Sequence, residues 1–208
     1  MPSRPLTAEP RRLTRRGAAT RARIAEAAAD LVFVHGVAGT RLDDVMLASA
    51  TSKSQLYHYF ADKDALIDEV IMLQTERVLA AQQPHLRRVD SMAGLRRWRD
   101  AIIEMNQVRG GVGGCPVGSL ASELADRSES ARELLTHSFQ SWESYLIDGL
   151  QAMRDRGDLT AEADPAELAG ALMAALQGGL LLAQTTRTTR PLELALDMAL
   201  EHVARRLR

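Results

Sequence analysis

The segment RLDDVMLASATSKSQLYHYFADK, residues 41–63, carries the strongest structural signal in the chain. Leu42, Val45 and Met46 recur at three- and four-residue spacings, which places them on one side of a helix. Two aspartates lie beside this apolar stripe and not within it. The pattern therefore predicts a short amphipathic helix over residues 41–49.

The second half of the segment predicts another short helix after a tight turn. Ala50 and Thr51 form the turn, and the Ser52 side chain offers an oxygen that can cap a helix over 53–59. Leu56 is the one apolar anchor of that helix, and its other side chains are hydrogen-bond donors, acceptors and flat rings. Two short helices joined in this way are typical of a motif that enters the major groove of DNA.

The same residues carry a resemblance to a known family. The run Leu56-Tyr57-His58-Tyr59-Phe60, followed by Lys63-Asp64-Ala65-Leu66, resembles the signature of tetracycline-repressor-like (TetR family) transcriptional regulators. The similarity covers roughly residues 20–70, back through Arg21-Ile24-Ala28-Phe33-Gly36. Ala50 is a departure, because the family usually has glycine in the turn. Ser54-Gln55 is not the commonest pair in the family, so the operator cannot be inferred from a relative.

The resemblance and the composition together predict an all-α homodimer. Alanine, leucine, arginine and glutamate dominate the chain, and strand-like alternation is almost absent. We expect a disordered basic arm over 1–19, a helix-turn-helix DNA-binding domain over 20–66, and a helical effector-binding and dimerisation domain over 67–208. The resemblance implies a repressor that leaves a palindromic operator on double-stranded DNA when a small-molecule effector, apolar or aromatic, binds the body.

We expect the contacts to DNA to come from the two short helices and the residues next to them. Gln55 can form a bidentate pair with adenine, and the tyrosines suit phosphate oxygens and thymine methyl groups. The resemblance implies that Lys63 binds a phosphate at the start of the next helix. The predicted DNA-binding residues are Arg41, Thr51, Ser52, Lys53, Ser54, Gln55, Tyr57, His58, Tyr59 and Lys63.

The charge of the chain is segregated. Residues 1–23 contain seven arginines and one glutamate, a net charge of +6, so the formal charge of −1 for the whole chain leaves −7 for the remainder. A basic arm on an acidic body is a footprint of phosphate binding. A solvated, disordered tail has the same composition and remains an alternative.

Apolar periodicity and capping residues predict the remaining helices. A first helix over 20–35 ends at Gly36, which supplies a left-handed residue. Ser130 and Glu133 form a capping-box pair that opens the longest body helix. The expected helices, with approximate limits, cover 20–35, 63–83 after the Asp62 cap, 91–109, 116–126, 130–156, 165–184 and 191–207.

Cys115 is the only cysteine in the chain, so no intramolecular disulfide is possible. Pro116 at the first helical position places Cys115 at the N-cap, where the helix dipole lowers a thiol pKa and favours an electrophile- or oxidant-sensing thiolate. A small apolar residue at a helix start is the alternative. The preceding glycines at 110–114 lack the GxGxxG register and follow no strand, which favours a flexible joint over a nucleotide site.

Large, soft side chains on the body helices predict an effector pocket, although ordinary core packing gives the same pattern. The candidate pocket residues are Trp98, Ile102, Met105, Cys115, Phe139, Trp142, Tyr145, Met173 and Gln177. The five histidines are scattered, without an HxxxH pair. We therefore expect no metal, no cofactor and no catalytic residues.

The last two helices predict a subunit interface, with packing inside one chain as the alternative. A strip of small residues at Ala171, Ala174 and Gly178 suits the close approach of a second helix. The apolar window 172–183 is too short to span a bilayer, and no secretory signal precedes the head. These features predict a bacterial cytoplasmic protein that does not interact with membranes and that associates with the nucleoid when bound to DNA.

Two other classes of protein stay open at this level. An enzyme would require a titratable constellation in the body, and none is visible. A pure interaction module would keep the helical body and a head that no longer binds DNA.

Overall fold

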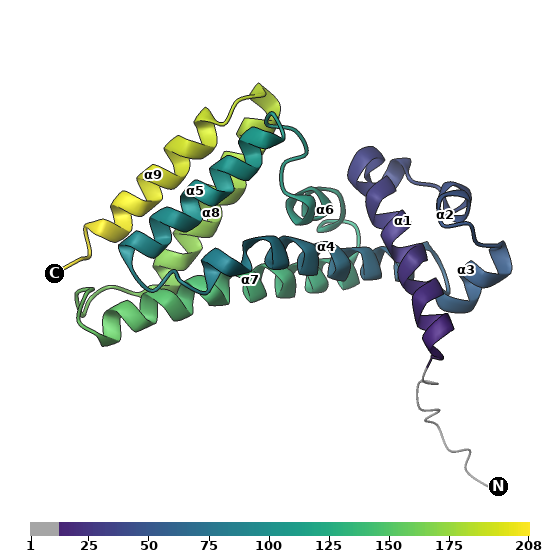
Figure 1. Cartoon of the computed structure of the whole chain (residues 1–208), viewed down its shortest axis with the longest axis horizontal. Coiled ribbons are helices and arrows are strands. Elements are labelled where there is room, and N and C mark those ends of the chain that lie inside the picture. The colour runs from purple at the N-terminus through teal and green to yellow at the C-terminus, as the bar shows by residue number, and fades with distance from the viewer. Residues whose placement is uncertain (1–12) are drawn as a thin grey trace, which may run out of the picture.

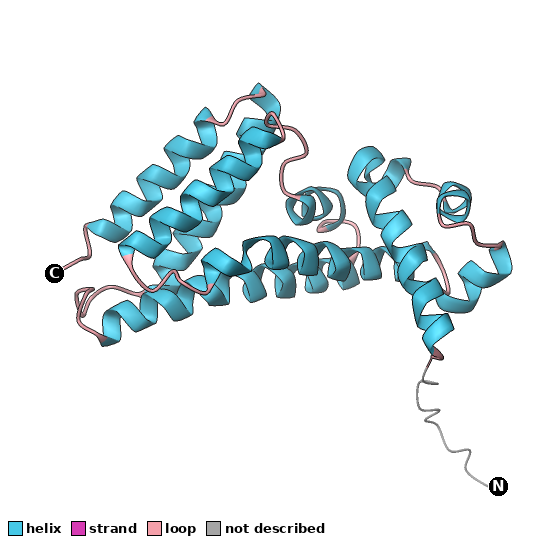
Figure 2. Cartoon of the chain, viewed as in Figure 1, coloured by secondary structure: helices cyan, strands magenta, loops and turns pink. Residues whose placement is uncertain are grey.

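The computed structural model describes residues 13–208, which fold into nine α-helices (Figures 1 and 2). The only bridge pair among them joins Leu159 to Leu207. The prediction of an all-α fold is confirmed. The helices are α1 (Arg15–Gly39), α2 (Leu42–Ala48), α3 (Lys53–Tyr59), α4 (Lys63–Leu86), α5 (Met92–Val108), α6 (Pro116–Leu124), α7 (Glu129–Asp155), α8 (Pro165–Thr186) and α9 (Arg190–Ala204).

The first three helices form a head at one end of the molecule, and α5 to α9 form a body (Figure 1). The long helix α4 leaves the head and runs beside α7 into the body. A small apolar core packs the three helices of the head against one another. Its buried residues include Ile24, Val45, Leu56 and Phe60. Apolar residues at helical spacing therefore produce the head that the sequence predicts.

Several helix limits differ from the prediction: α1 runs on to Gly39 and α9 already ends at Ala204, and two further differences have a clear cause. Helix α1 begins at Arg15, and the Thr14 hydroxyl accepts a hydrogen bond from Gly17 N at 3.1 Å, so the last residues of the predicted arm are helical. The rest of that arm, residues 1–12, lies outside the described residues. Helix α4 continues past Pro84 to Leu86, because the burial of Leu86 stabilises one further turn.

The predicted capping box at Ser130 and Glu133 is wrong. Ser128 is the N-cap of α7, and its hydroxyl accepts a hydrogen bond from Ala131 N at 3.2 Å. Ser130 instead donates to Asp68 Oδ2 at 3.2 Å, between α7 and α4. The periodicity of the apolar residues located this helix, but two serines two residues apart left the first turn ambiguous.

A carboxylate on α6 joins the body to the head. Glu123 Oε2 accepts hydrogen bonds from Val37 N at 2.9 Å and Ala38 N at 3.3 Å, and we call this contact the Glu123 clamp. It lies at a kink in α1, where Gly36 has φ 72° and ψ 172°, a region that only glycine adopts readily. A Cβ at Gly36 would lie 2.7 Å from Glu123 Oε1. The predicted left-handed Gly36 is therefore present, although the chain returns to helical geometry after it.

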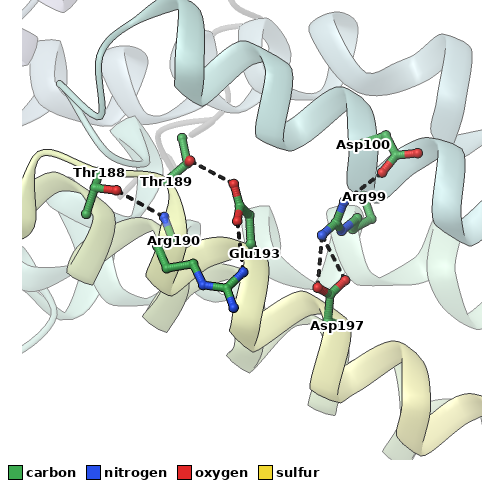
Figure 3. A network of polar contacts seen from close by, with 7 residues as sticks. All are labelled: Arg99, Asp100, Thr188, Thr189, Arg190, Glu193 and Asp197. Carbon is green, nitrogen blue, oxygen red and sulfur yellow. Dashed lines mark hydrogen bonds and ion pairs between the residues drawn. The ribbon is translucent and has the colours of Figure 1, made fainter.

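Charged side chains connect α5 to α9 within the body (Figure 3). Arg99 donates to Asp100 at 2.8 Å on its own helix and to Asp197 on α9 at 2.9 Å. The first turn of α9 is held by Glu193, which accepts a hydrogen bond from Thr189 at 2.9 Å. These contacts fix α9 against the body and leave its opposite side exposed.

Helix α8 is apolar enough to raise the question of a membrane. It has 22 residues and a window of mean hydropathy 1.5, so by length and composition it could cross a bilayer. The length of α8 therefore does not by itself exclude a membrane span, contrary to the prediction from residues 172–183. In the structure α8 packs between α7 and α9, as the core helices of soluble proteins do, although only 39% of the window is buried within the chain.

Substitution at Gly36 tests the Glu123 clamp. We expect Gly36→Ala to lower the free energy of unfolding by about 2 kcal/mol or more, because a Cβ strains the backbone and displaces Glu123. Gly110→Ala is the matched control, since Gly110 also has positive φ (60°) but has open space around it. Urea denaturation of both variants measures the difference.

A Glu123→Ala background separates the two causes. Without the carboxylate, the loss from Gly36→Ala reduces to backbone strain alone. Equal losses in the two backgrounds would show that a Cβ at Gly36 does not disturb the clamp, while the loss from Glu123→Ala alone measures what the clamp contributes.

Candidate nucleic-acid interface and effector cavity

Helix α3 is short, and local hydrogen bonds define its start. The Ser52 hydroxyl accepts from Gln55 N at 3.2 Å, and Gln55 Oε1 accepts from Ser52 N at 2.9 Å, which completes a capping box. Leu56 anchors the helix in the head core. The side chains that remain exposed, which we name the recognition surface after their predicted role, are Ser52, Lys53, Ser54, Gln55, Tyr57 and His58.

Three of the predicted DNA-binding residues have contacts inside the head. Thr51 is only 9% exposed, and its hydroxyl lies 2.7 Å from that of Ser49, so its role in the free protein is to hold the turn. Lys63 Nζ donates to the carbonyls of Val37 and Thr40, both at 2.7 Å, which leaves one of its three donors free. Tyr59 is half-buried and packs edge-on against His58.

The capping box also constrains Gln55. Its carbonyl oxygen is occupied by Ser52 N, so only the amide nitrogen is free. A bidentate pair with adenine would require this capping bond to break. Arg41 is exposed at the N-cap of α2 and makes no side-chain capping bond there.

Two arginines counted with the basic arm stabilise the head. Arg21 forms a bidentate pair with Glu69 on α4, at 2.5 and 2.6 Å, and lies over the Phe60 ring at 5.3 Å. Arg23 Nε donates to the carbonyl of Ser49 at 2.8 Å and so satisfies the end of α2. Their charges are therefore used mainly to hold the head helices together.

Arg15 and Arg16 remain exposed at the first turn of α1. This turn lies beside the recognition surface, because a Cβ on Gly17 would lie 3.3 Å from the Tyr59 hydroxyl. The helix start, and not only an arm, therefore brings positive charge next to α3. Sequence reasoning assigned these arginines to the arm, since nothing in their spacing marked Thr14 as the cap.

A cavity of about 570 Å³ lies between the head and the body. It is lined from α1, α4, α5, α7, α8 and the loop that leads into α6. Four of the predicted pocket residues line it: Ile102, Met105, Cys115 and Trp142. The size falls within the range of about 300–1,000 Å³ that is usual for small-molecule sites.

The other predicted pocket residues lie elsewhere. Trp98 is fully buried behind the cavity wall, where its Nε1 donates to Gln82 Oε1 at 3.0 Å. Phe139, Met173 and Gln177 line a separate hollow of about 220 Å³, and Tyr145 lines none of the cavities described for residues 13–208. In this chain, aromatic and sulfur-containing residues at helical spacing are thus a better indicator of the buried core than of the cavity wall.

The polar residues of the wall were missed. Asn106 and Arg109 continue the face of α5 that carries Ile102 and Met105, so helical spacing could have found them. The wall residues absent from the prediction are Asp30, Phe33, Gln74, Arg77, Val78, Ala81, Gln82, Asn106, Arg109, Val112, Gly114, Pro116 and Leu180. Asp30 and Phe33 belong to α1, so the head itself forms part of the wall.

Burial determines the chemistry of the cavity wall. Asn106 (5% exposed) and Trp142 (2% exposed) each bury a polar atom, Oδ1 and Nε1, without a hydrogen-bond partner among the described residues. Leaving a buried donor or acceptor unpaired costs about 1–3 kcal/mol. Arg77 pairs with Asp30 at 3.0 Å. Arg109 is exposed and forms no ion pair within the described part of the chain.

The predicted N-cap role of Cys115 is confirmed, but the predicted pKa shift is wrong. Cys115 Sγ accepts a hydrogen bond from Gly118 N at 3.3 Å. Burial nevertheless raises the pKa of the Cys115 thiol, and the hydrogen bond from Gly118 N offsets this only in part. Desolvation of the thiolate outweighs the helix N-terminus, so the thiol is protonated at neutral pH.

Alkylation measures the state of Cys115 directly. We expect iodoacetamide at pH 7 to modify the native chain at least tenfold more slowly than free cysteine, because the thiol is both buried and protonated. Modification in urea is the control and should proceed at the rate of an unfolded thiol. A native rate equal to or above that of free cysteine would contradict this description.

The geometry defines a class of protein: a helix-turn-helix DNA-binding head on a helical body with a small-molecule cavity. Family models match both parts, with "Bacterial regulatory proteins, tetR family" over residues 24–70 and "Tetracyclin repressor-like, C-terminal domain" over 91–199. The chain belongs to the tetracycline repressor family of transcriptional regulators. Regulators of this family bind DNA and small-molecule effectors, form dimers, and are soluble cytoplasmic proteins.

Individual relatives agree with this assignment. An HTH-type transcriptional regulator in the lacX 3' region of Lactococcus lactis is 31% identical over 184 residues, which cover 86% of this chain and 90% of the relative. The HTH-type transcriptional repressor NemR of Escherichia coli K12 is 29% identical, over 85% of this chain and 90% of NemR. Both relatives are transcriptional regulators, which agrees with the descriptions of the matched family models.

Solved structures share the whole fold. A TetR transcriptional regulator from Chloroflexus aurantiacus has a TM-score of 0.79 at 27% identity, over 94% of this chain and 99% of that chain. Reduced E. coli NemR has a TM-score of 0.68 at 26% identity, over 87% of this chain and 95% of that chain.

Proposed function

We propose that this regulator is a repressor that binds a palindromic operator as a homodimer and is released when a small molecule occupies the 570 Å³ cavity. The observation that carries the proposal is the shared wall of that cavity, to which both the DNA-binding head and the body contribute. We assign DNA binding to the head up to residue 66, and effector binding and dimerisation to 67–208. The name of the relative NemR as a repressor supports the direction of regulation.

The recognition surface supports direct reading of DNA. Lys53 and Ser54 begin α3 with exposed donors, and Tyr57 and His58 follow on its exposed side. Phosphate contacts fix the register of such a helix, while contacts to base edges supply the specificity. The exposed start of α1 adds cations beside this surface.

The uncovered side of α8 and α9 supports dimerisation. Leu181 (61% exposed) on α8 and Met198 (67% exposed) on α9 are large apolar side chains facing solvent in the single chain. Gly179 packs closely against Leu192 of α9, whereas Gly178 has open space beside it. Two copies of α8 and α9 would cover these side chains in a four-helix bundle and set two recognition helices about 34–36 Å apart, as successive major grooves require.

Contacts between α6 and α1 provide a route for coupling. Cys115 and Pro116, at the start of α6, line the cavity, and Glu123, at its other end, holds the kink of α1. A ligand that moves α6 by a fraction of a helical turn would therefore shift the backbone at Val37 and Ala38. Lys63 ties that same backbone to α4, so the head would turn as a unit. Effector and operator then oppose each other because each favours a different head position.

Fluorescence anisotropy on the DNA flanking the gene for this chain tests operator binding. We expect sequence-selective binding that weakens with salt, and we expect Lys53→Ala to weaken it and to reduce the salt slope by about 1, because one phosphate contact is lost. Arg97→Ala is the matched control, since Arg97 is an exposed cation on the body helix α5. Equal binding to scrambled DNA would exclude a specific regulator, provided other genomic fragments also failed.

Analytical ultracentrifugation tests the proposed interface. A Leu181→Glu, Met198→Glu double variant should sediment as a monomer at concentrations where the unaltered chain is a dimer, because it places charges in the apolar contact. Leu47→Glu is the control, since Leu47 is 84% exposed on α2 in the head. A double variant that remains a dimer would exclude this pair of helices as the interface.

A further inference from the structure

The lining of the head–body cavity points to the chemical class of its ligand. This inference rests on the effector role proposed above for the same cavity. Most of the wall is apolar, with Ile102, Met105, Val78 and Leu180 among its residues. The wall has few polar groups. Which of them carry an unpaired charge determines the ligands that the cavity favours.

The charges of the wall leave one cation free. The ionisable residues in the lining are Asp30, Arg77, Arg109 and Cys115. Asp30 and Arg77 pair with each other at 3.0 Å, and the buried Cys115 thiol is uncharged. Arg109 thus supplies the one positive charge that the wall does not itself neutralise. One unbalanced guanidinium favours a ligand with a single negative charge over a neutral or cationic ligand of the same shape.

The unpaired polar atoms of Trp142 and Asn106 lie beneath the surface of the wall, with almost no area open to the cavity. Trp142 has an indole N–H without a partner, and an indole can only donate. Asn106 has an unpaired carboxamide that can accept or, when rotated, donate. Gln82 has its oxygen engaged by Trp98, so its amide group can only donate further. Gln74, in contrast, donates its amide to Ala29 O at 3.3 Å and keeps its oxygen as an acceptor, so the wall offers both donors and acceptors and its charge is what selects among ligands.

We propose that the cavity binds an aromatic carboxylate, with the carboxylate paired to Arg109. A flat apolar ring system fits between Ile102 and Met105 on α5 and the helices opposite. A phosphate ester fits less well, because its second charge would have no free cation in the wall. An organic cation finds only Asp30, which Arg77 already neutralises.

Isothermal titration calorimetry on the full chain tests this class with three probes of matched shape: 2-naphthoate, 2-naphthamide and 2-naphthylmethylammonium. We expect 2-naphthoate to bind at least tenfold more tightly than 2-naphthamide, and the ammonium compound to give no heat of binding. Equal affinities for the three, a preference for the ammonium compound, or no binding by any of them at millimolar concentration would overturn the proposal.

Variants locate the interaction. Arg109→Gln should reduce the affinity for 2-naphthoate to that for 2-naphthamide and leave the latter unchanged. Arg97→Gln, on the same helix but outside the cavity wall, should change neither. Thermal unfolding of the Arg109→Gln and Arg97→Gln variants confirms that both are folded. An Arg109→Gln variant that keeps the preference for 2-naphthoate would overturn the pairing.

The anisotropy assay separates this proposal from the proposed function. If 2-naphthoate binds through Arg109 but leaves the DNA complex intact, the ligand class stands and release by the effector fails. If uncharged compounds release DNA while 2-naphthoate neither binds nor releases it, release by an effector stands and the ligand class fails.

Discussion

The recognition helix α3 has seven residues, and a helix of that length is not stable in water without tertiary contacts. Burial of Leu56 and of Phe60 just beyond it supplies about 2 kcal/mol each, and the Ser52–Gln55 capping box adds about 1 kcal/mol. Buried residues of α1, α2 and α4, among them Ile24, Val45 and Leu66, belong to the same apolar core. Every feature of the head that bears on DNA therefore depends on the packing of one small apolar core.

That core explains why several polar residues of the motif face inward. Arg21 and Arg23 fasten α1 to α4 and α2, and Lys63 fastens α4 to the end of α1. A small head of short helices has little apolar surface, so charge-assisted hydrogen bonds to exposed carbonyl ends contribute much of its rigidity. The surface left for DNA is correspondingly narrow and centres on the outer side of α3.

Apolar periodicity and capping residues predicted the fold well because these signals are local. The limits of α3, the N-cap at Cys115 and the start of α8 all depend on neighbouring residues. The cavity depends on contacts across the chain, and only four of nine proposed residues line it. Trp98 and Tyr145 look like Trp142 in the sequence, and only the packing of distant helices shows which of them reaches the open space. The same holds for Cys115, where burial reversed the pKa shift that the N-cap position predicts.

The Glu123 clamp has a consequence for how such regulators diversify. Glu123 holds main-chain N–H groups, so the side chains at Val37 and Ala38 are free to vary without loss of the contact. The contact itself requires only the glycine at the kink and the acid on α6, although Val37 also packs against the core. Consider a head that prefers a different operator but has glycine at the equivalent kink. Its main-chain N–H groups could donate to Glu123 of this body in the same way. The joint is therefore suited to recombination, in which chimaeras exchange DNA specificity while they retain the ligand response.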